Sequence, residues 1–260
     1  MKRTFLILML VMLSVVGVFQ YAGAADEGRT PFYVGAAIGP NWRATADDPA
    51  SLTTFNKPGF AFDLVMGVRL EGVDNKLLQN LRFELEYSKQ YNKIDMLELH
   101  PLGNLREKGS GYIDVESYAV VTYYDFPIRK LSPSTTGFLS HLSPYVGLGL
   151  GFNRSILRNL SSASLNALAN TPISQGGLGG DGTGYHLYYT TDFVFGISPR
   201  FGVTYELSKH LEVSLGAKYM ASNHVYVDAY GSYHIPPEYV SVNKPNVNYW
   251  DTQLGIKYNF

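Results

Sequence analysis

The last eleven residues alternate between two kinds of side chain without a break. The even positions are apolar apart from one threonine: Trp250, Thr252, Leu254, Ile256, Tyr258 and Phe260. The odd positions are polar or small: Asp251, Gln253, Gly255, Lys257 and Asn259. A period of two predicts a β-strand with one apolar and one polar face. Ten steps of ~3.3 Å, tilted by ~40°, rise roughly 25 Å, which is the height of the apolar band around a transmembrane barrel.

Seven further segments carry the same alternation. It is clear over 60–69, 81–91, 145–152, 193–206 and 211–221, and weaker over 31–42 and 112–125. In 112–125 the stretch from Tyr118 to Tyr124 is apolar on both faces, and we assign Asp114 and Glu116 to the inward face. These segments make eight strands with the C-terminal one, and bacterial single-chain barrels have an even number of strands. In lipid, only closed barrels and helices satisfy all backbone polar groups. The sequence predicts an all-β, eight-stranded antiparallel up-and-down transmembrane β-barrel. Ten strands, with a wider lumen, result if 185–191 or 224–233 form further hairpins.

The first 24 residues have the pattern of a secretory signal peptide. Lys2 and Arg3 precede an apolar stretch that is too short to span a membrane, and Ala22 and Ala24 form a small-x-small cleavage site. We therefore expect a signal peptide over 1–24 and one outer-membrane barrel domain over 25–260. Without Lys2 and Arg3, 19 basic residues face 22 acidic ones, a net charge of −3 that does not favour nucleic acid. The absence of cysteine excludes a thiol nucleophile and a Cys-ligated metal site.

The connections divide by length on the whole, with the long link 126–143 as the exception. We expect external loops at about 43–57, 92–111, 155–190 and 224–246, and periplasmic links at 70–80, 126–143 and 207–210. The external loops are rich in tyrosine, which offers a large rigid contact surface with a polar tip. This composition is typical of recognition surfaces, but also of the aromatic rim of a barrel.

Several motifs resemble those of small outer-membrane barrels of the opacity-protein and surface-antigen families and of the OmpA transmembrane domain. They are PFYVGAAIG, VVTYYDF, PYVGLGLGF, GISPRFGVTYELSKHLEVSLGAKYM and QLGIKYNF. The resemblance implies location in the cell outer membrane of a Gram-negative bacterium. It also implies that the barrel-assembly machinery reads a C-terminal insertion signal, which here matches Leu254, Ile256, Tyr258 and Phe260. Outer-membrane lipid and lipopolysaccharide are further expected partners.

The inward positions of the predicted strands carry acids and bases in similar number. An eight-stranded barrel is just wide enough for side chains to fill it, and unpaired charges there are costly. We predict a lumen ionic network, with Arg69 beside it, made of Asp63, Arg82, Glu84, Glu86, Asp192, Arg200, Glu206, Glu212, Lys218, Asp251 and Lys257. Such a network plugs the lumen; the alternative is a small or gated ion path.

Three functions remain open. The first is a structural or adhesin-like surface protein that recognises a host or matrix ligand through its external loops, and the second is a narrow porin. The third is a lipid A-modifying hydrolase, since Ser222-Asn223 lies near the end of a late strand as in lipid A deacylases. Met220 stands where their histidine would be, and only His224 could replace it, so we predict no enzyme. No cofactor and no metal spacing is recognised.

Overall fold

The computed structural model describes residues 31–43, 46–48, 51–54, 57–70, 73, 75, 77–99, 105–131, 136–177, 187–191, 193–222, 227–231 and 248–260. The predicted signal peptide with Ala22 and Ala24, and Asp192, lie outside these residues. Eight long strands dominate the structure: β1 Phe32–Arg43, β4 Gly59–Arg69, β5 Leu81–Lys93, β7 Leu105–Asp125, β8 Leu142–Ser162, β10 Val194–Glu206, β11 Leu211–Ser222 and β13 Tyr249–Asn259.

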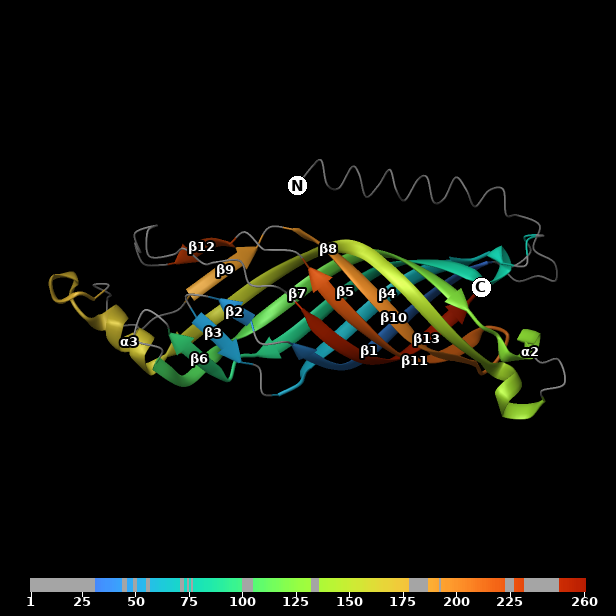
Figure 1. The fold of residues 1–260 in the computed structure, drawn as a ribbon, viewed down its shortest axis with the longest axis horizontal. Coiled ribbons are helices and arrows are strands. Elements are labelled where there is room, and N and C mark those ends of the chain that lie inside the picture. Colours follow the sequence, from blue (N-terminus) through green and yellow to red (C-terminus); the bar gives the residue numbers. More distant parts are fainter. Residues whose placement is uncertain are drawn as a thin grey trace.

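These eight strands form one closed antiparallel ring, seen from the side in Figure 1. Each strand pairs with the next of the eight along the chain, and β13 returns to β1, for example through Val34 opposite Tyr258. The predicted eight-stranded barrel is confirmed. β9 (Leu187–Thr191) and β12 (Val227–Gly231) do form from the segments that could have widened it, but β9 pairs with the outer part of β8 and β12 pairs with β9, outside the ring. The ten-strand alternative is wrong.

Successive side chains point alternately to the membrane and to the lumen. On β13, Leu254 is 57% and Ile256 50% exposed, whereas Asp251 is 0% and Lys257 8% exposed. Large apolar side chains on the outer surface are typical of a protein whose neighbours are lipid chains rather than water.

The predicted register of β7 is wrong by one residue. Val115, Ala119, Val121 and Tyr123 are buried and form its inward face. Asp114 and Glu116 lie on the outward face instead, where Glu116 meets Lys89 of β5. The physical reason is that apolar side chains fill part of this lumen, so polarity alone does not distinguish the two faces.

Two strands continue past the ring at its outer end. β7 and β8 each have 21 residues, and their outer parts pair with β6 (Met96–Leu99) on one side and β9 on the other. β3 (Ser51–Thr54) and β2 (Ala46–Asp48) extend the β6 side. Figure 1 shows this extension, with α3 (Ala163–Asn170), at the end of the barrel opposite α2 and the C-terminus. Parts of the expected external loops are therefore strands.

Two of the three periplasmic links contain short helices. The link β4–β5 contains η2 (Leu78–Asn80), and the link β7–β8 contains α2 (Ile128–Leu131) and η4 (Gly137–His141). A further short helix, η5 (Ile173–Gln175), follows α3 at the outer end. None of the helices in the described residues is long and apolar enough to cross a membrane.

Glycines on the inward face make room for large lumen side chains. A Cβ at Gly147 would lie 2.4 Å from the ring of Tyr123, and one at Gly67 would lie 2.3 Å from the ring of Tyr33. Both distances are far below van der Waals contact. The alternation Gly-Leu-Gly-Leu-Gly in β8 therefore places leucine against lipid and leaves space for a tyrosine on the neighbouring strand.

Candidate functional site: the filled lumen

Glu84 of β5 is the centre of a charged cluster in the periplasmic half of the lumen. Its carboxylate accepts hydrogen bonds from Lys257 Nζ at 2.6 Å and from the Tyr33 hydroxyl at 2.6 Å, and it also pairs with Arg82. Arg82 in turn pairs with Asp125 at 2.9 Å, and its guanidinium lies over the ring of Tyr123 at 3.9 Å. Two cations and a hydroxyl on one carboxylate replace the water that burial removes.

Lys218 of β11 is the centre of a second cluster, further toward the outer end. Its ammonium group lies 2.7 Å from Asp63, 3.1 Å from Glu86 and 3.5 Å from Asp251. It also donates a hydrogen bond to the hydroxyl of Ser88 at 3.0 Å. These contacts join four strands, β4, β5, β11 and β13, across the lumen.

Arg200 of β10 connects the clusters through a two-pronged contact with Glu86. One guanidinium nitrogen bonds Oε1 at 3.0 Å and the other contacts Oε2. Arg200 also donates to the hydroxyls of Tyr123 at 3.2 Å and Ser198 at 3.0 Å. Bidentate arginine–carboxylate pairs are geometrically specific, so this contact fixes β10 relative to β5 on the opposite wall.

Only a small void remains between the two clusters. It has a volume of about 50 Å³ and is lined by Glu84, Glu86, Tyr123, Lys218 and Lys257 among others. A void of this size holds one or two water molecules. At this level, therefore, side chains fill the lumen.

The outer part of the lumen is polar but carries little charge. Asn41 and Gln90 donate to Asp251, Gln90 at 3.2 Å, and Ser117 donates to Asn153. Beside them Met220, Val115 and Tyr249 form a buried apolar cluster. Buried amide atoms of Asn41, Gln90 and Asn153 lack a protein partner, which is typical of positions where water completes the hydrogen bonding.

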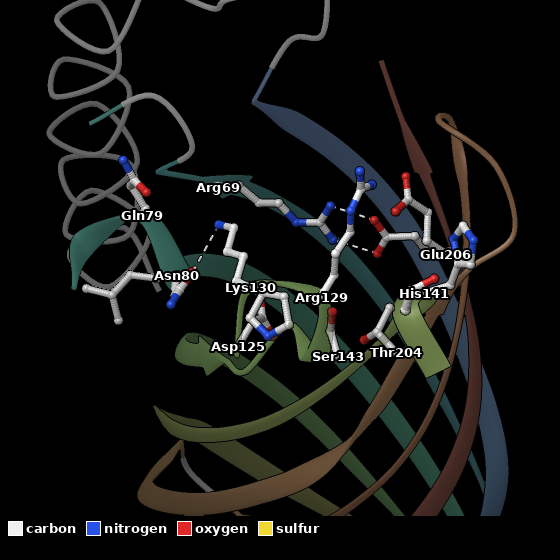
Figure 2. A pocket seen from close by; sticks show the side chains of 14 residues that line it. Arg69, Gln79, Asn80, Asp125, Arg129, Lys130, His141, Ser143, Thr204 and Glu206 are labelled. Atoms are coloured by element: carbon white, nitrogen blue, oxygen red, sulfur yellow. Dashed lines mark hydrogen bonds and ion pairs between the residues drawn. The ribbon is translucent and has the colours of Figure 1, made fainter. Parts of the chain in front are cut away.

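A cavity of about 380 Å³ opens at the periplasmic mouth. Figure 2 shows Arg69, Asn80, Lys130, His141 and Glu206 around it. Arg69 forms a bidentate pair with Glu212 at 2.5 and 2.6 Å, and Asn259 donates to the same carboxylate at 2.9 Å. This pair separates the cavity from the charged clusters above it.

The structure places the predicted network residues as follows. Asp63, Arg82, Glu84, Glu86, Arg200, Lys218, Asp251 and Lys257 meet in the two clusters. Glu212 lies below them with Arg69, and Glu206 lines the mouth cavity. Among the described residues, no group of three or more His, Asp or Glu is placed to hold a metal ion.

Several members of the site are missing from the sequence prediction. Tyr33, Tyr123, Ser88, Asn41 and Gln90 take part in the network, whereas the prediction rests on charged positions alone. Tyr33 has a usable signal, because it sits between Phe32 and Val34 on the opposite face of the strand. A tyrosine on the inward face of a narrow barrel requires a polar partner for its hydroxyl.

Comparison with known proteins agrees with this architecture. The family model described as the outer membrane protein beta-barrel domain matches residues 8–260. The chain belongs to this family. It is therefore an outer-membrane β-barrel protein, and the predicted location in the outer membrane is confirmed.

Three solved structures are similar to this chain, and the first of them shares its fold. Neisserial surface protein A is 18% identical, with a TM-score of 0.51, over 90% of this chain and 100% of its own. A major outer membrane protein from Thermus thermophilus is 10% identical, with a TM-score of 0.44, over 88% and 99%. The attachment invasion locus protein Ail of Yersinia pestis, solved with a heparin analogue, is also 10% identical, with a TM-score of 0.40, over 88% and 99%. No curated protein matches the sequence.

Proposed function

We propose that this protein is a non-conducting surface protein of the outer membrane, which presents its outer extension for structural or adhesive contacts. The observation that carries the proposal is the filled lumen. Lys218, Glu86 and Arg200 join opposite walls of the barrel, and each of these side chains is at most 4% exposed. Solutes would have to break several buried ion pairs to pass.

The outer extension supports the recognition part of the proposal. A barrel that served only as a membrane anchor needs strands just long enough to cross the apolar layer. Here β7 and β8 continue for several residues beyond the last pairings with β5 and β10, and five further strands extend the sheet from them. A paired sheet holds a surface more rigidly than a free loop, which lowers the entropy lost on binding.

The geometry around Ser222 favours a protein without lipid A hydrolase activity. Ser222 and Met220 both face the lumen, at 7% and 2% exposure, whereas the acyl chains of a lipid substrate lie on the other face of the strand. The candidate base His224 lies outside the described residues. Mass spectrometry of lipid A from cells with and without the protein tests this part, and loss of an acyl chain on expression would contradict it.

Planar-bilayer recording of the purified barrel tests the central part. We expect no stable channel for the wild type. A variant that removes two cations of the network, Lys218→Ala together with Arg200→Ala, is expected to conduct if it folds, because the lumen then loses the bridges across it. A persistent nanosiemens conductance of the wild type would favour the narrow porin and refute the proposal.

A further inference from the structure

The link between β7 and β8 is longer than the barrel requires. The backbone N–H of Phe126 still donates to the carbonyl oxygen of Pro144 at 2.7 Å, so the two strands are paired where the link begins. A turn of about two to five residues is enough to join paired antiparallel strands. Instead, the chain runs out and back through α2 and η4 before it enters β8. Strand connection alone therefore gives no reason for the length of this link.

Residues of this link line the cavity of about 380 Å³ at the periplasmic mouth, which is within the size range of small-molecule pockets. They are Pro127, Arg129, Lys130, Ser140 and His141. Lys130 Nζ donates a hydrogen bond to Oδ1 of Asn80 in η2 at 3.1 Å, as Figure 2 shows. The link is thus joined to the neighbouring periplasmic link, and the two together build the rim of the cavity.

Two ion pairs close the floor of the cavity. Arg69 holds Glu212 through both guanidinium nitrogens, and Arg82 Nε lies 2.9 Å from Asp125. Arg82 is buried, and above it lie Glu84 and the rest of the charged clusters. The cavity is therefore a blind pocket at the periplasmic end rather than the entrance to a channel.

The lining carries equal numbers of permanent cations and acids, but they are not all paired with one another. The set consists of Arg69, Arg129, Lys130, Asp125, Glu206 and Glu212. The floor pairs engage Arg69, Glu212 and Asp125. Arg129 and Lys130 are exposed, and neither forms an ion pair within the part of the chain that the structure describes. Two cations can therefore receive an incoming carboxylate.

The opposite side of the cavity is acidic. Figure 2 shows Lys130 next to Asn80 on one side and Glu206 on the other. Glu206 stands directly across from Glu212 in the β10–β11 pairing, so two carboxylates meet there. A purely anionic ligand would be repelled by them, whereas a ligand with one charge of each sign matches both sides. Amide and hydroxyl groups in the lining, such as Gln79 and Thr204, can hydrogen-bond peptide groups.

We propose that this cavity binds a short periplasmic peptide with free termini, whose carboxylate contacts Arg129 and Lys130 and whose ammonium group lies toward Glu206. Hydrogen bonds between ionised groups are the strong ones, and a carboxylate can accept several. Glu206 can therefore bind an ammonium group in addition to its contacts within the protein. This inference goes beyond the function proposed above, because it concerns the periplasmic end and holds whatever the outer extension contacts.

Isothermal titration calorimetry of the full chain, folded in detergent micelles, tests the proposal with tri-L-alanine as the probe. The test variant carries Arg129→Gln and Lys130→Gln. A matched control carries Lys93→Gln and Lys209→Gln, which removes the same charge from exposed positions outside the cavity. The heat-dependent shift of the folded barrel on SDS gels shows which variants are folded.

We expect the control to bind tri-L-alanine as the wild type does, and the test variant to bind it about 10-fold or more weakly, since charge-assisted contacts are lost. Tri-L-alanine amide lacks the carboxylate and should bind the wild type as weakly. It should lose nothing further in the test variant, because the two changes remove the same contact. A structural defect would not reproduce this non-additivity.

Absence of binding to the wild type, equal binding by the test variant, or an equal loss in the control would overturn the proposal. N-acetyl-tri-L-alanine lacks the ammonium group and should bind the wild type more weakly than tri-L-alanine, whereas Glu206→Gln should bind the two alike. Equal binding of both peptides to the wild type, or displacement of the peptide by inorganic phosphate at similar concentration, would show a plain anion site and refute the peptide. Bilayer conductance, which tests the filled lumen, is a separate readout.

Discussion

Replacement of Lys218 by methionine should be among the most destabilising single changes in the barrel wall. The side chain is 3% exposed, and its ammonium group is shared by Asp63, Glu86 and Asp251. Methionine fills a similar volume but carries no charge, so the packing changes little while three carboxylates lose a common partner. The loss is therefore electrostatic.

The three carboxylates differ in what they retain. Glu86 keeps its bidentate contact with Arg200, and Asp251 keeps hydrogen bonds from Asn41 and Gln90. Asp63 keeps the hydroxyl of Ser88, at 2.5 Å, which carries no charge. Removal of one partner of a buried ion pair costs about 3–5 kcal/mol, because the remaining charge stays buried without compensation. We expect Lys218→Met to lower the free energy of unfolding by this amount.

A double mutant isolates the origin of the effect. Asp63→Asn removes the charge that Lys218→Met leaves unpaired, so the double variant should lose less than the sum of the two single variants, by about 1–3 kcal/mol. Lys89→Met is the matched control. It breaks a lysine–carboxylate pair of similar length on the outward face, where Lys89 is 24% exposed, and such pairs contribute about 0–1 kcal/mol.

Urea unfolding in phospholipid vesicles gives these free energies. Trp42 and Trp250 are the two tryptophans of the chain, and both lie on the outward face, so their fluorescence reports the transfer of the barrel out of the bilayer. A loss below about 1 kcal/mol for Lys218→Met, or a loss equal to that of Lys89→Met, would refute the electrostatic interpretation of the lumen.

Three further outcomes are expected. Phe260→Ala, at the predicted insertion signal, should reduce the amount of heat-modifiable protein in isolated outer membranes, and an unchanged amount would contradict the assignment. Gly147→Leu should destabilise the barrel by about 1–3 kcal/mol in the same unfolding assay, since the new side chain must displace the ring of Tyr123. In the outer extension, partial burial opposes ionisation of Glu107, but hydrogen bonds from Ser162 and Ser164 outweigh it and lower its pKa. The ionised Glu107 therefore stabilises the folded protein at pH values above its ordinary pKa of about 4.3, and this stabilisation is lost as the pH falls through the folded-state pKa. Amide exchange of α3 should accelerate in acid in the wild type but not in Glu107→Gln.

The strands could be predicted because lipid imposes a strict rule. Within the apolar band the outward side chains are uncharged and almost all apolar, whereas the neighbouring inward positions are polar or small, as from Trp250 to Phe260. The eight predicted segments agree with the observed strands at most ends to within a residue or two. Outside the membrane, lipid no longer imposes this alternation. Residues 105–111 and 153–162 continue as strands in water, where no lipid enforces alternation, so no period of two marks them.

Whether an individual side chain faces the lumen or the outside can be predicted only where lipid imposes the alternation. A charged residue indicates the lumen within the apolar band, as Glu84 and Lys218 show. Nearer the outer end of the strands this inference fails, because Glu116 lies on the outward face beside Lys89. Partners inside the lumen could not be derived from one strand at a time, since the contact between Arg200 and Glu86 depends on the diameter of the ring. The assembly signal, the external partners and the absence of catalysis stay predictions.

Spin-label accessibility along β13 tests the alternating barrel most directly. The chain contains no cysteine, so single cysteines at successive positions from Trp250 to Tyr258 can each be labelled without background. In reconstituted membranes, labels at even positions should be accessible to oxygen dissolved in the lipid, and labels at odd positions should be shielded from both oxygen and a water-soluble nickel reagent. Uniform access to the water-soluble reagent, or accessibility without a period of two, would contradict the structure described above.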